Sequence, residues 1–144
     1  MNLPTYDISQ IEELTFSFIS TGVNGKIKKI IKYSRLNEQL FNLAFGDQIK
    51  DSAFIDDNAN SNNGDLRKVL ATVISTIPIF FEKHPRCAIY LQGSDNRRTR
   101  TYQRIIKNYR KEFGYLYLFY GGTNAVFEQF DEEKDYSYFV IFKN

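Results

Sequence analysis

The chain has 144 residues, of which 42% are hydrophobic and 25% charged, and its formal net charge is only +2. This length predicts a single domain, 1–144, and the composition excludes extensive disorder, which requires low hydrophobicity with high net charge. One Cys and one His exclude a disulfide framework and a Cys/His zinc site. The chain has neither an 18-residue apolar run nor a secretion signal, and this predicts a cytoplasmic protein with no membrane contact.

Three segments before residue 48 show the alternation of half-buried strands. Residues 14–20 alternate Leu14, Phe16 and Phe18 with polar neighbours, and residues 21–25 supply a glycine-bearing hairpin loop. Residues 26–36 place apolar and lysine side chains on opposite faces, and residues 39–47 repeat the alternation. The Asn/Asp-rich residues 48–63 that follow predict a long loop.

Apolar residues at helical spacing predict two helices in the rest of the chain. The first runs from Asp65, which can cap it, to about His84, and Pro78 should kink it or end its regular part. The second runs from Ser94 or Asp95 to about Phe113. Residues 87–92, 115–120 and 136–143 predict strands. The result is an α+β fold with a mostly antiparallel sheet and two helices, in the order β-β-β-α-β-α-β-β.

The small net charge hides an uneven distribution of charge along the chain. Residues 97–111 hold seven basic side chains and no acid, whereas the rest of the chain holds 12 basic and 17 acidic side chains. Acidic residues gather in 47–65 and again in 131–135. On a helix, most of the basic side chains lie on one face, with Tyr102, Ile106 and Tyr109 on the opposite one. We expect the basic face to be exposed and the apolar face to be buried.

This basic face is the strongest functional signal in the sequence. No acid interleaves it, and three arginines crowd the helix N-terminus, where the macrodipole disfavours cations. Arginines around free N–H groups at a strand-to-helix turn favour an anion site. The candidate anion-binding or nucleic-acid-binding residues are Arg97, Arg98, Arg100, Arg104, Lys107 and Lys111, together with Gly93 and Ser94 in the turn before them.

Other interpretations of the basic face stay open on sequence alone. It is also typical of a solvated surface helix, and acidic residues of the loop region would neutralise it internally: Asp47, Asp56, Asp57 and Asp65. An external anion would be a phosphorylated ligand or nucleic acid, on a track extended by Lys26, Lys28, Lys29 and Lys32. Tyr102 or Tyr109 would stack on bases only if it is not in the core. We assign no catalytic residue, no metal ligand and no cofactor.

Two resemblances add to this interpretation. The runs NLAFGD (42–47), NNGDLRKVLATV (62–73) and GSDNRRTRTYQRII (93–106) resemble a family of short, uncharacterised bacterial proteins of Bacteroidetes type, described only as a domain of unknown function. This resemblance covers nearly the whole chain. It implies a bacterial origin and no activity, and it implies that Asn63, Gly64 and Asp65 and the 93–102 turn belong to the family's shared pattern.

The element order is similar to the acyl-CoA N-acetyltransferase fold after its first two helices. That resemblance implies a pyrophosphate site at the N-terminus of the helix after the third strand, here residues 62–65. The loop of that family has Gln or Arg, then Gly, then Gly or Ala. This chain has Ser61, Gly64 and Leu66, so only the Gly matches, and Asp65 would repel pyrophosphate.

The sequence therefore predicts a non-enzymatic module whose basic helix engages phosphate groups or nucleic acid, in a regulatory or toxin–antitoxin role. One alternative is an acyltransferase-like enzyme with a phosphorylated cofactor at the 93–102 turn. Another is a protein-interaction module whose basic face meets an acidic partner surface. A deep pocket at residues 93–100 would favour the enzyme, and a flat exposed stripe would favour the other two.

Overall fold

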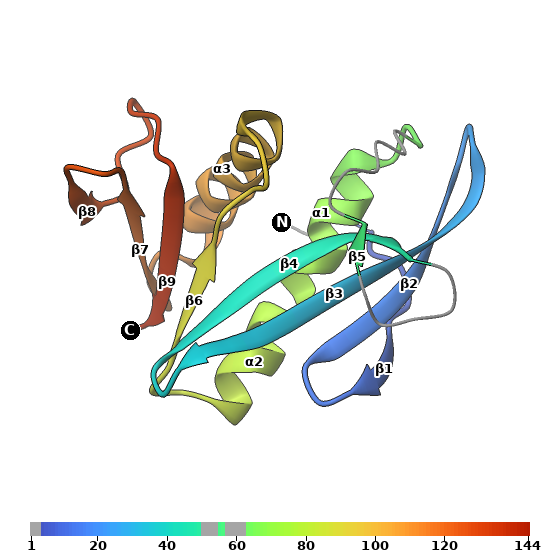
Figure 1. Ribbon diagram of the computed structural model, residues 1–144, viewed down its shortest axis with the longest axis horizontal. Coiled ribbons are helices and arrows are strands. Elements are labelled where there is room, and N and C mark those ends of the chain that lie inside the picture. The colour runs from blue at the N-terminus through green and yellow to red at the C-terminus, as the bar shows by residue number, and fades with distance from the viewer. Residues whose placement is uncertain (1–3, 50–54, 57–62) are drawn as a thin grey trace. The chain divides into compact units, whose positions relative to one another are not determined.

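A computed structural model describes residues 4–49, 55–56 and 63–144 (Figure 1). It confirms the α+β class and the predicted order of elements. The helices are α1 (Leu66–Ser75), α2 (Ile77–Lys83) and α3 (Asn96–Phe113). The strands are β1 (Ser9–Glu12), β2 (Thr15–Gly22), β3 (Gly25–Asn37), β4 (Leu40–Gln48), β5 (Ile55–Asp56), β6 (Ala88–Leu91), β7 (Tyr117–Gly122), β8 (Phe127–Gln129) and β9 (Tyr138–Lys143).

The strands form a sheet that is mostly antiparallel, as the sequence predicts. Over the described residues the order is β1-β2-β3-β4-β6-β9-β7-β8, and β5 pairs with the end of β4. Within the described part of the sheet, β4 and β6 pair in parallel, with Leu40 opposite Ala88, because the helical connection between them carries the chain back to the same end of the sheet. The short strands β1, β5 and β8 escape prediction because four, two and three residues show no clear alternation.

The chain forms two compact units, and β3 and β4 run through both. The first comprises residues 1–34 and 43–80, and the second comprises residues 35–42 and 81–144. In the first, α1 lies beside β3 and β4 (Figure 1), Phe16, Phe18 and Ile31 are buried, and the ring of Tyr33 stacks on Phe80 with centroids 5.0 Å apart. The single domain predicted for 1–144 stays a prediction.

The first predicted helix divides at Thr76, two residues before Pro78. Proline lacks the N–H that would bond to the Ile74 carbonyl, and it disfavours helical geometry in the residue before it. The hydroxyls of Ser75 and Thr76 turn back to the carbonyls of Thr72 and Val73, at 2.6 and 2.7 Å. The predicted effect of Pro78 is therefore confirmed.

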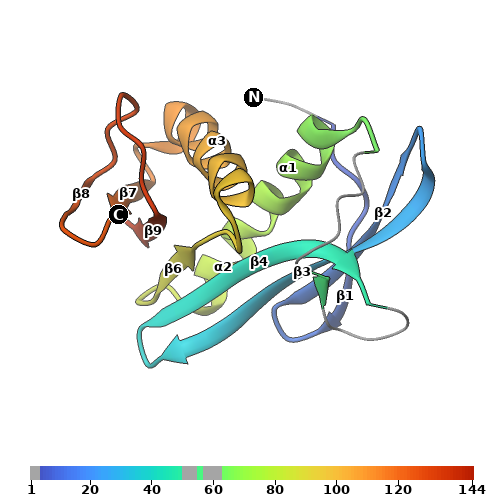
Figure 2. The ribbon, with the colours of Figure 1, turned by 45° about the horizontal axis from the view of Figure 1, so that its top comes forward.

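The second unit is built on α3, which lies along one face of β6, β9 and β7 (Figure 2). The predicted apolar side of this helix is buried, with Tyr102 6%, Ile106 1% and Tyr109 3% exposed. The ring of Tyr109 stacks on Tyr117, with centroids 5.6 Å apart, and meets Phe119 edge-on. This packing fixes the rotation of α3 and directs its opposite side to solvent.

Candidate functional site

The turn before α3 packs closely against the first turn of the helix. Asp95 is the N-cap, and its carboxylate accepts a 2.8 Å hydrogen bond from the Arg98 N–H. Gly93 lies so close to the first turn that a Cβ there would overlap the Thr99 N–H and the Arg98 backbone. The prediction that Ser94 or Asp95 caps the helix is confirmed, with Asp95 in that place. An anion at this turn would meet a carboxylate already bonded to a first-turn N–H.

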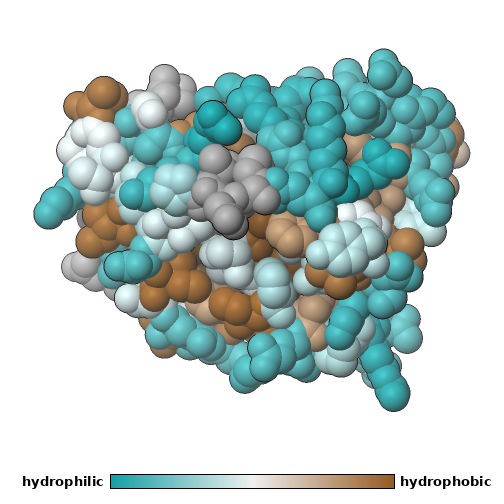
Figure 3. Space-filling model, turned by 180° about the vertical axis from the view of Figure 1, so that it is seen from behind, coloured by the Kyte–Doolittle hydropathy of each residue, from teal (hydrophilic) through white to brown (hydrophobic). Residues whose placement is uncertain are grey.

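The exposed side of α3 carries a row of cations that we call the α3 stripe: Arg100, Arg104, Lys107 and Lys111. Arg104, Lys107 and Lys111 are exposed, and within the described part of the chain none of the three forms an ion pair. Figure 3, which shows the side of the molecule that includes α3, is largely hydrophilic in its upper part. The predicted exposure of the basic face is confirmed for these three residues.

Arg100 corrects that prediction, because it is engaged by the chain itself. Its side chain is 40% exposed, and its Nη1 lies 2.9 Å from a carboxylate oxygen of Asp135. The guanidinium also donates to the Tyr136 carbonyl and to the Gln103 side chain. Arg97 is exposed and Arg98 half-buried, and each interacts with another residue. The structure therefore leaves Arg104, Lys107 and Lys111 as the candidate cations that are exposed and form no ion pair with another described residue.

Two carboxylates of the 47–65 region have partners inside the first unit. Asp47 pairs with Lys29 at 2.6 Å, and both side chains are largely buried, at 17% and 11% exposed. Asp65 accepts hydrogen bonds from the hydroxyls of Tyr6 and Ser20. Asp57 and the side chain of Asp56 lie outside the described residues. Buried Lys29 is therefore no part of the predicted lysine track, whereas Lys26 and Lys28 are exposed.

The acid that pairs with the α3 stripe comes instead from residues 131–135, which we call the acidic loop. Its four carboxylates and Lys134 belong to residues that are all exposed. The Gln103 side chain binds this loop beside Arg100, donating to the Lys134 carbonyl at 2.8 Å. Sequence analysis located both charged segments, but their contact joins residues more than 30 positions apart and leaves no local pattern.

Tyr136 anchors the acidic loop. Its hydroxyl donates to Glu128 at 2.6 Å and accepts from the Asp131 N–H at 3.0 Å, and its ring packs over Gly121. Burial, followed by the hydrogen bond to Glu128, raises the pKa of Tyr136 to about 12. Hydrogen bonds from Tyr136 and Lys134 lower the pKa of Glu128. The fold thus favours a neutral phenol beside an ionised carboxylate.

We expect Tyr136→Phe to lower the free energy of unfolding at pH 7 by about 1–3 kcal/mol, because the Glu128 carboxylate and the Asp131 N–H each lose their hydrogen bond to the phenol. A raised pKa means that the stabilisation by the phenol is complete below pH 10 and is lost as the pH rises through about 12. The variant should therefore lose less stability than the wild type between pH 10 and 12. Urea unfolding across pH 7–12 measures this, with exposed Tyr115→Phe as control. Parallel curves for wild type and Tyr136→Phe would contradict it.

A second polar cluster ties the β2–β3 hairpin to the start of α1. The Asn63 amide accepts from the Asn24 N–H at 2.6 Å and donates to Ser20 Oγ and the Gly25 carbonyl. Asp65 occupies the N-cap position, but its side chain makes no capping bond, since Tyr6 and Ser20 hold it. This corrects the predicted cap. It also gives residues 63–65 a structural role.

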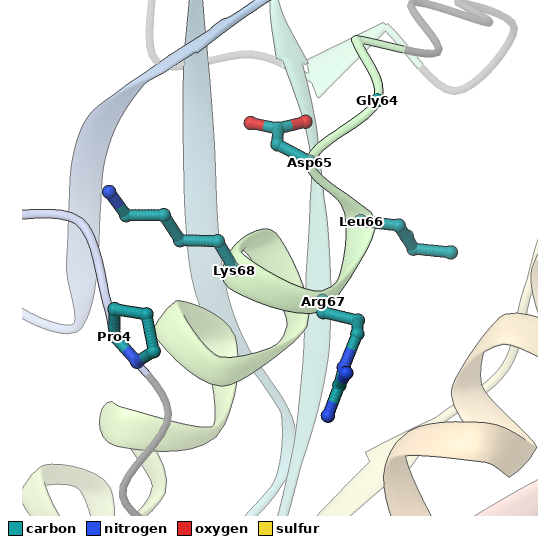
Figure 4. Close-up of a pocket in the computed structure, with 6 residues that line it drawn as sticks. All are labelled: Pro4, Gly64, Asp65, Leu66, Arg67 and Lys68. Carbon is teal, nitrogen blue, oxygen red and sulfur yellow. The ribbon is translucent and has the colours of Figure 1, made fainter.

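A pocket of about 570 Å³ opens at the N-terminus of α1, lined by Pro4, Gly64, Asp65, Leu66, Arg67 and Lys68 (Figure 4). Figure 4 shows Lys68 on the same side of the helix as Pro4, with Leu66 and Arg67 directed the other way. The Lys68 ammonium lies 4.2 Å from the centre of the Tyr6 ring. The Asp65 carboxylate stands at the helix start, where it disfavours a bound pyrophosphate.

Two further observations bear on the kinds of site available. Among the residues described, no three or more His, Cys, Asp and Glu side chains gather where they would hold a metal ion. No described helix is both long and apolar enough to cross a membrane.

Comparison with known proteins assigns nearly the whole chain to one protein family. No curated protein matches it, and no solved structure does. A family model described as "Family of unknown function (DUF6934)" matches residues 2–144. The closed turn, the α3 stripe and the cluster at residues 63–65 all lie within this match. The chain therefore belongs to the DUF6934 family of unknown function.

Proposed function

We propose that this protein is a non-enzymatic module that binds the phosphate groups of nucleic acid through the α3 stripe. In this proposal it acts in the bacterial cytoplasm, in a regulatory or toxin–antitoxin role. The observation that carries the proposal is the exposure of Arg104, Lys107 and Lys111 without an ion pair among the described residues. A helix maintained only for stability gains from acids interleaved with its bases, and residues 97–111 contain none.

The spacing of the three cations suits a phosphate backbone. Residues 104 to 111 span about 10 Å along the helix axis, at about 1.5 Å per residue. Each of the three long basic side chains can neutralise one phosphate, so the stripe allows up to three contacts with one strand of a duplex. The three side chains therefore match a short stretch of backbone.

The burial of the nearby aromatic side chains supports backbone contact over base stacking. Tyr102 is 6% and Tyr109 3% exposed, so neither ring presents a face to solvent on α3. Binding through Arg and Lys alone depends on charge and carries little sequence information. Duplex DNA of arbitrary sequence is therefore a suitable probe.

The two alternatives predict different ligands. A phosphorylated cofactor at the 93–102 turn has weaker support, because Asp95 already bonds to a first-turn N–H and Gly93 is packed against the helix. An acidic protein surface would use the same stripe as nucleic acid. The proposed function predicts that duplex DNA binds through the stripe, whereas a cofactor site at the 93–102 turn does not require such binding.

We expect Arg104→Glu/Lys107→Glu to abolish duplex DNA binding while the fold survives, because both side chains point away from the core. Each phosphate that the protein neutralises contributes about −0.9 to the slope of log K against log salt concentration. Three contacts therefore predict a slope near −3 for the wild type. Fluorescence anisotropy with a 20-base-pair duplex at several salt concentrations measures both quantities.

The matched control is Arg86→Glu/Lys143→Glu, which makes the same change in net charge at exposed positions of the second unit outside α3. It should bind DNA with nearly the wild-type slope. Equal loss of binding in both double variants would show that net charge alone matters. Wild-type protein that does not bind the duplex at low salt would reject the proposed function.

A further inference from the structure

The acidic loop lies against the N-terminal end of the α3 stripe, in the place where the next phosphate of a bound backbone would lie. Arg100 precedes Arg104 by one helical turn, so it continues the row of cations along this side of α3. Its guanidinium faces Asp135 at 2.9 Å instead of solvent alone. The loop therefore supplies a carboxylate where a polyanion following the stripe would supply a phosphate.

The contact is held by more than one ion pair. Arg100 also donates to the Tyr136 carbonyl, and Gln103 donates to the Lys134 carbonyl at 2.8 Å. Both residues belong to the first half of α3 and both hold the end of the acidic loop. Arg100 and Gln103 are thus occupied by the chain itself, whereas Arg104, Lys107 and Lys111 are exposed to solvent.

The loop is shaped before any ligand arrives. The Lys134 N–H bonds to the Asp131 carbonyl, and the Glu133 N–H bonds to the Asp131 side chain, both at 3.0 Å. The buried ring and hydroxyl of Tyr136 fix the end of this turn. An acid on a fixed turn loses little conformational freedom when it pairs, so it competes well with an external anion.

We propose that Asp135 is an internal phosphate mimic that occupies Arg100 and limits the α3 stripe to three phosphate contacts. The inference rests on the proposed binding of nucleic acid by this stripe. Release of Asp135 adds Arg100 as a fourth contact. The acidic loop thereby sets the affinity of the protein for nucleic acid and the number of phosphates that it contacts.

The test is Asp135→Asn, which keeps the size of an exposed side chain and removes its charge. We expect duplex DNA to bind this variant about two- to fivefold more tightly, the range of an exposed ion pair. The salt slope should become steeper by about 0.9, which is the signature of one added phosphate contact. Glu82→Gln, an exposed acid in α2, removes one negative charge elsewhere and should leave the slope unchanged.

A double-variant cycle with Arg100→Gln identifies the residue that Asp135 blocks. Arg100→Gln should change binding little when Asp135 is present, and it should remove the whole gain in the Asp135→Asn background. Thermal unfolding checks that each variant is folded.

Two failures can be told apart. If the wild type binds DNA through Arg104 and Lys107 but Asp135→Asn behaves like Glu82→Gln, the mimic is rejected and the proposed function stands. Additive effects of Asp135→Asn and Arg100→Gln would reject it as well. If neither the wild type nor Asp135→Asn binds the duplex, the proposed function and the mimic are rejected together.

Discussion

Gly121→Ala is expected to lower the free energy of unfolding by about 3 kcal/mol. Gly121 lies in β7 directly beneath the ring of Tyr136, and a Cβ built there would overlap three ring carbons. Tyr136 is 3% exposed, so the added methyl forces a shift of the buried ring or of the strand. Overpacking of this kind costs about 1–3 kcal/mol, and the displaced hydroxyl also loses its bond to Glu128.

Urea unfolding of Gly121→Ala measures the loss, and a second substitution shows its cause. In a Tyr136→Ser background the ring is absent, so Gly121→Ala should cost much less than it does in the wild type. The coupling free energy between the two positions would then equal the destabilisation that the overlap causes. Additive effects of the two substitutions would contradict the close approach of ring and backbone.

Gly22→Ala should destabilise the first unit by a similar amount, about 2–4 kcal/mol. A Cβ at Gly22 would overlap the backbone carbonyl of Asn63, which accepts the Val23 N–H at 3.1 Å. To make room, the hairpin must move away from residue 63, and the bonds from the Asn63 amide to the hairpin weaken with it.

Val23→Ala is the control for Gly22→Ala, since Val23 belongs to the same turn and is 82% exposed. An exposed substitution of this kind should change stability by less than about 0.5 kcal/mol. Thermal and urea unfolding of the two variants under identical conditions decide the matter. Equal stability of Gly22→Ala and Val23→Ala would show that the hairpin does not need the close contact with Asn63.

The sequence by itself determined the order of the longer elements and the two faces of α3. Period-two alternation identified β2, β3 and β4, and helical spacing identified the buried side of α3 through Tyr102, Ile106 and Tyr109. These are local signals, because each depends on neighbours within one turn or one strand. The basic composition of residues 97–111 and the helix break at Pro78 are also local features, so the sequence predicted both.

Only the tertiary structure decided which charged residues are accessible. Arg100 and Arg104 are alike in sequence, but one faces Asp135 and the other faces solvent. Asp65 stands at a helix start like Asp95, but hydroxyls from Tyr6 and Ser20 draw its carboxylate away from the helix. Charge pairs and long-range hydrogen bonds join residues that are distant in sequence and that the fold brings together. The periodicity of the sequence does not predict these contacts. For this reason the sequence located the α3 stripe, and the fold determined how much of it faces solvent.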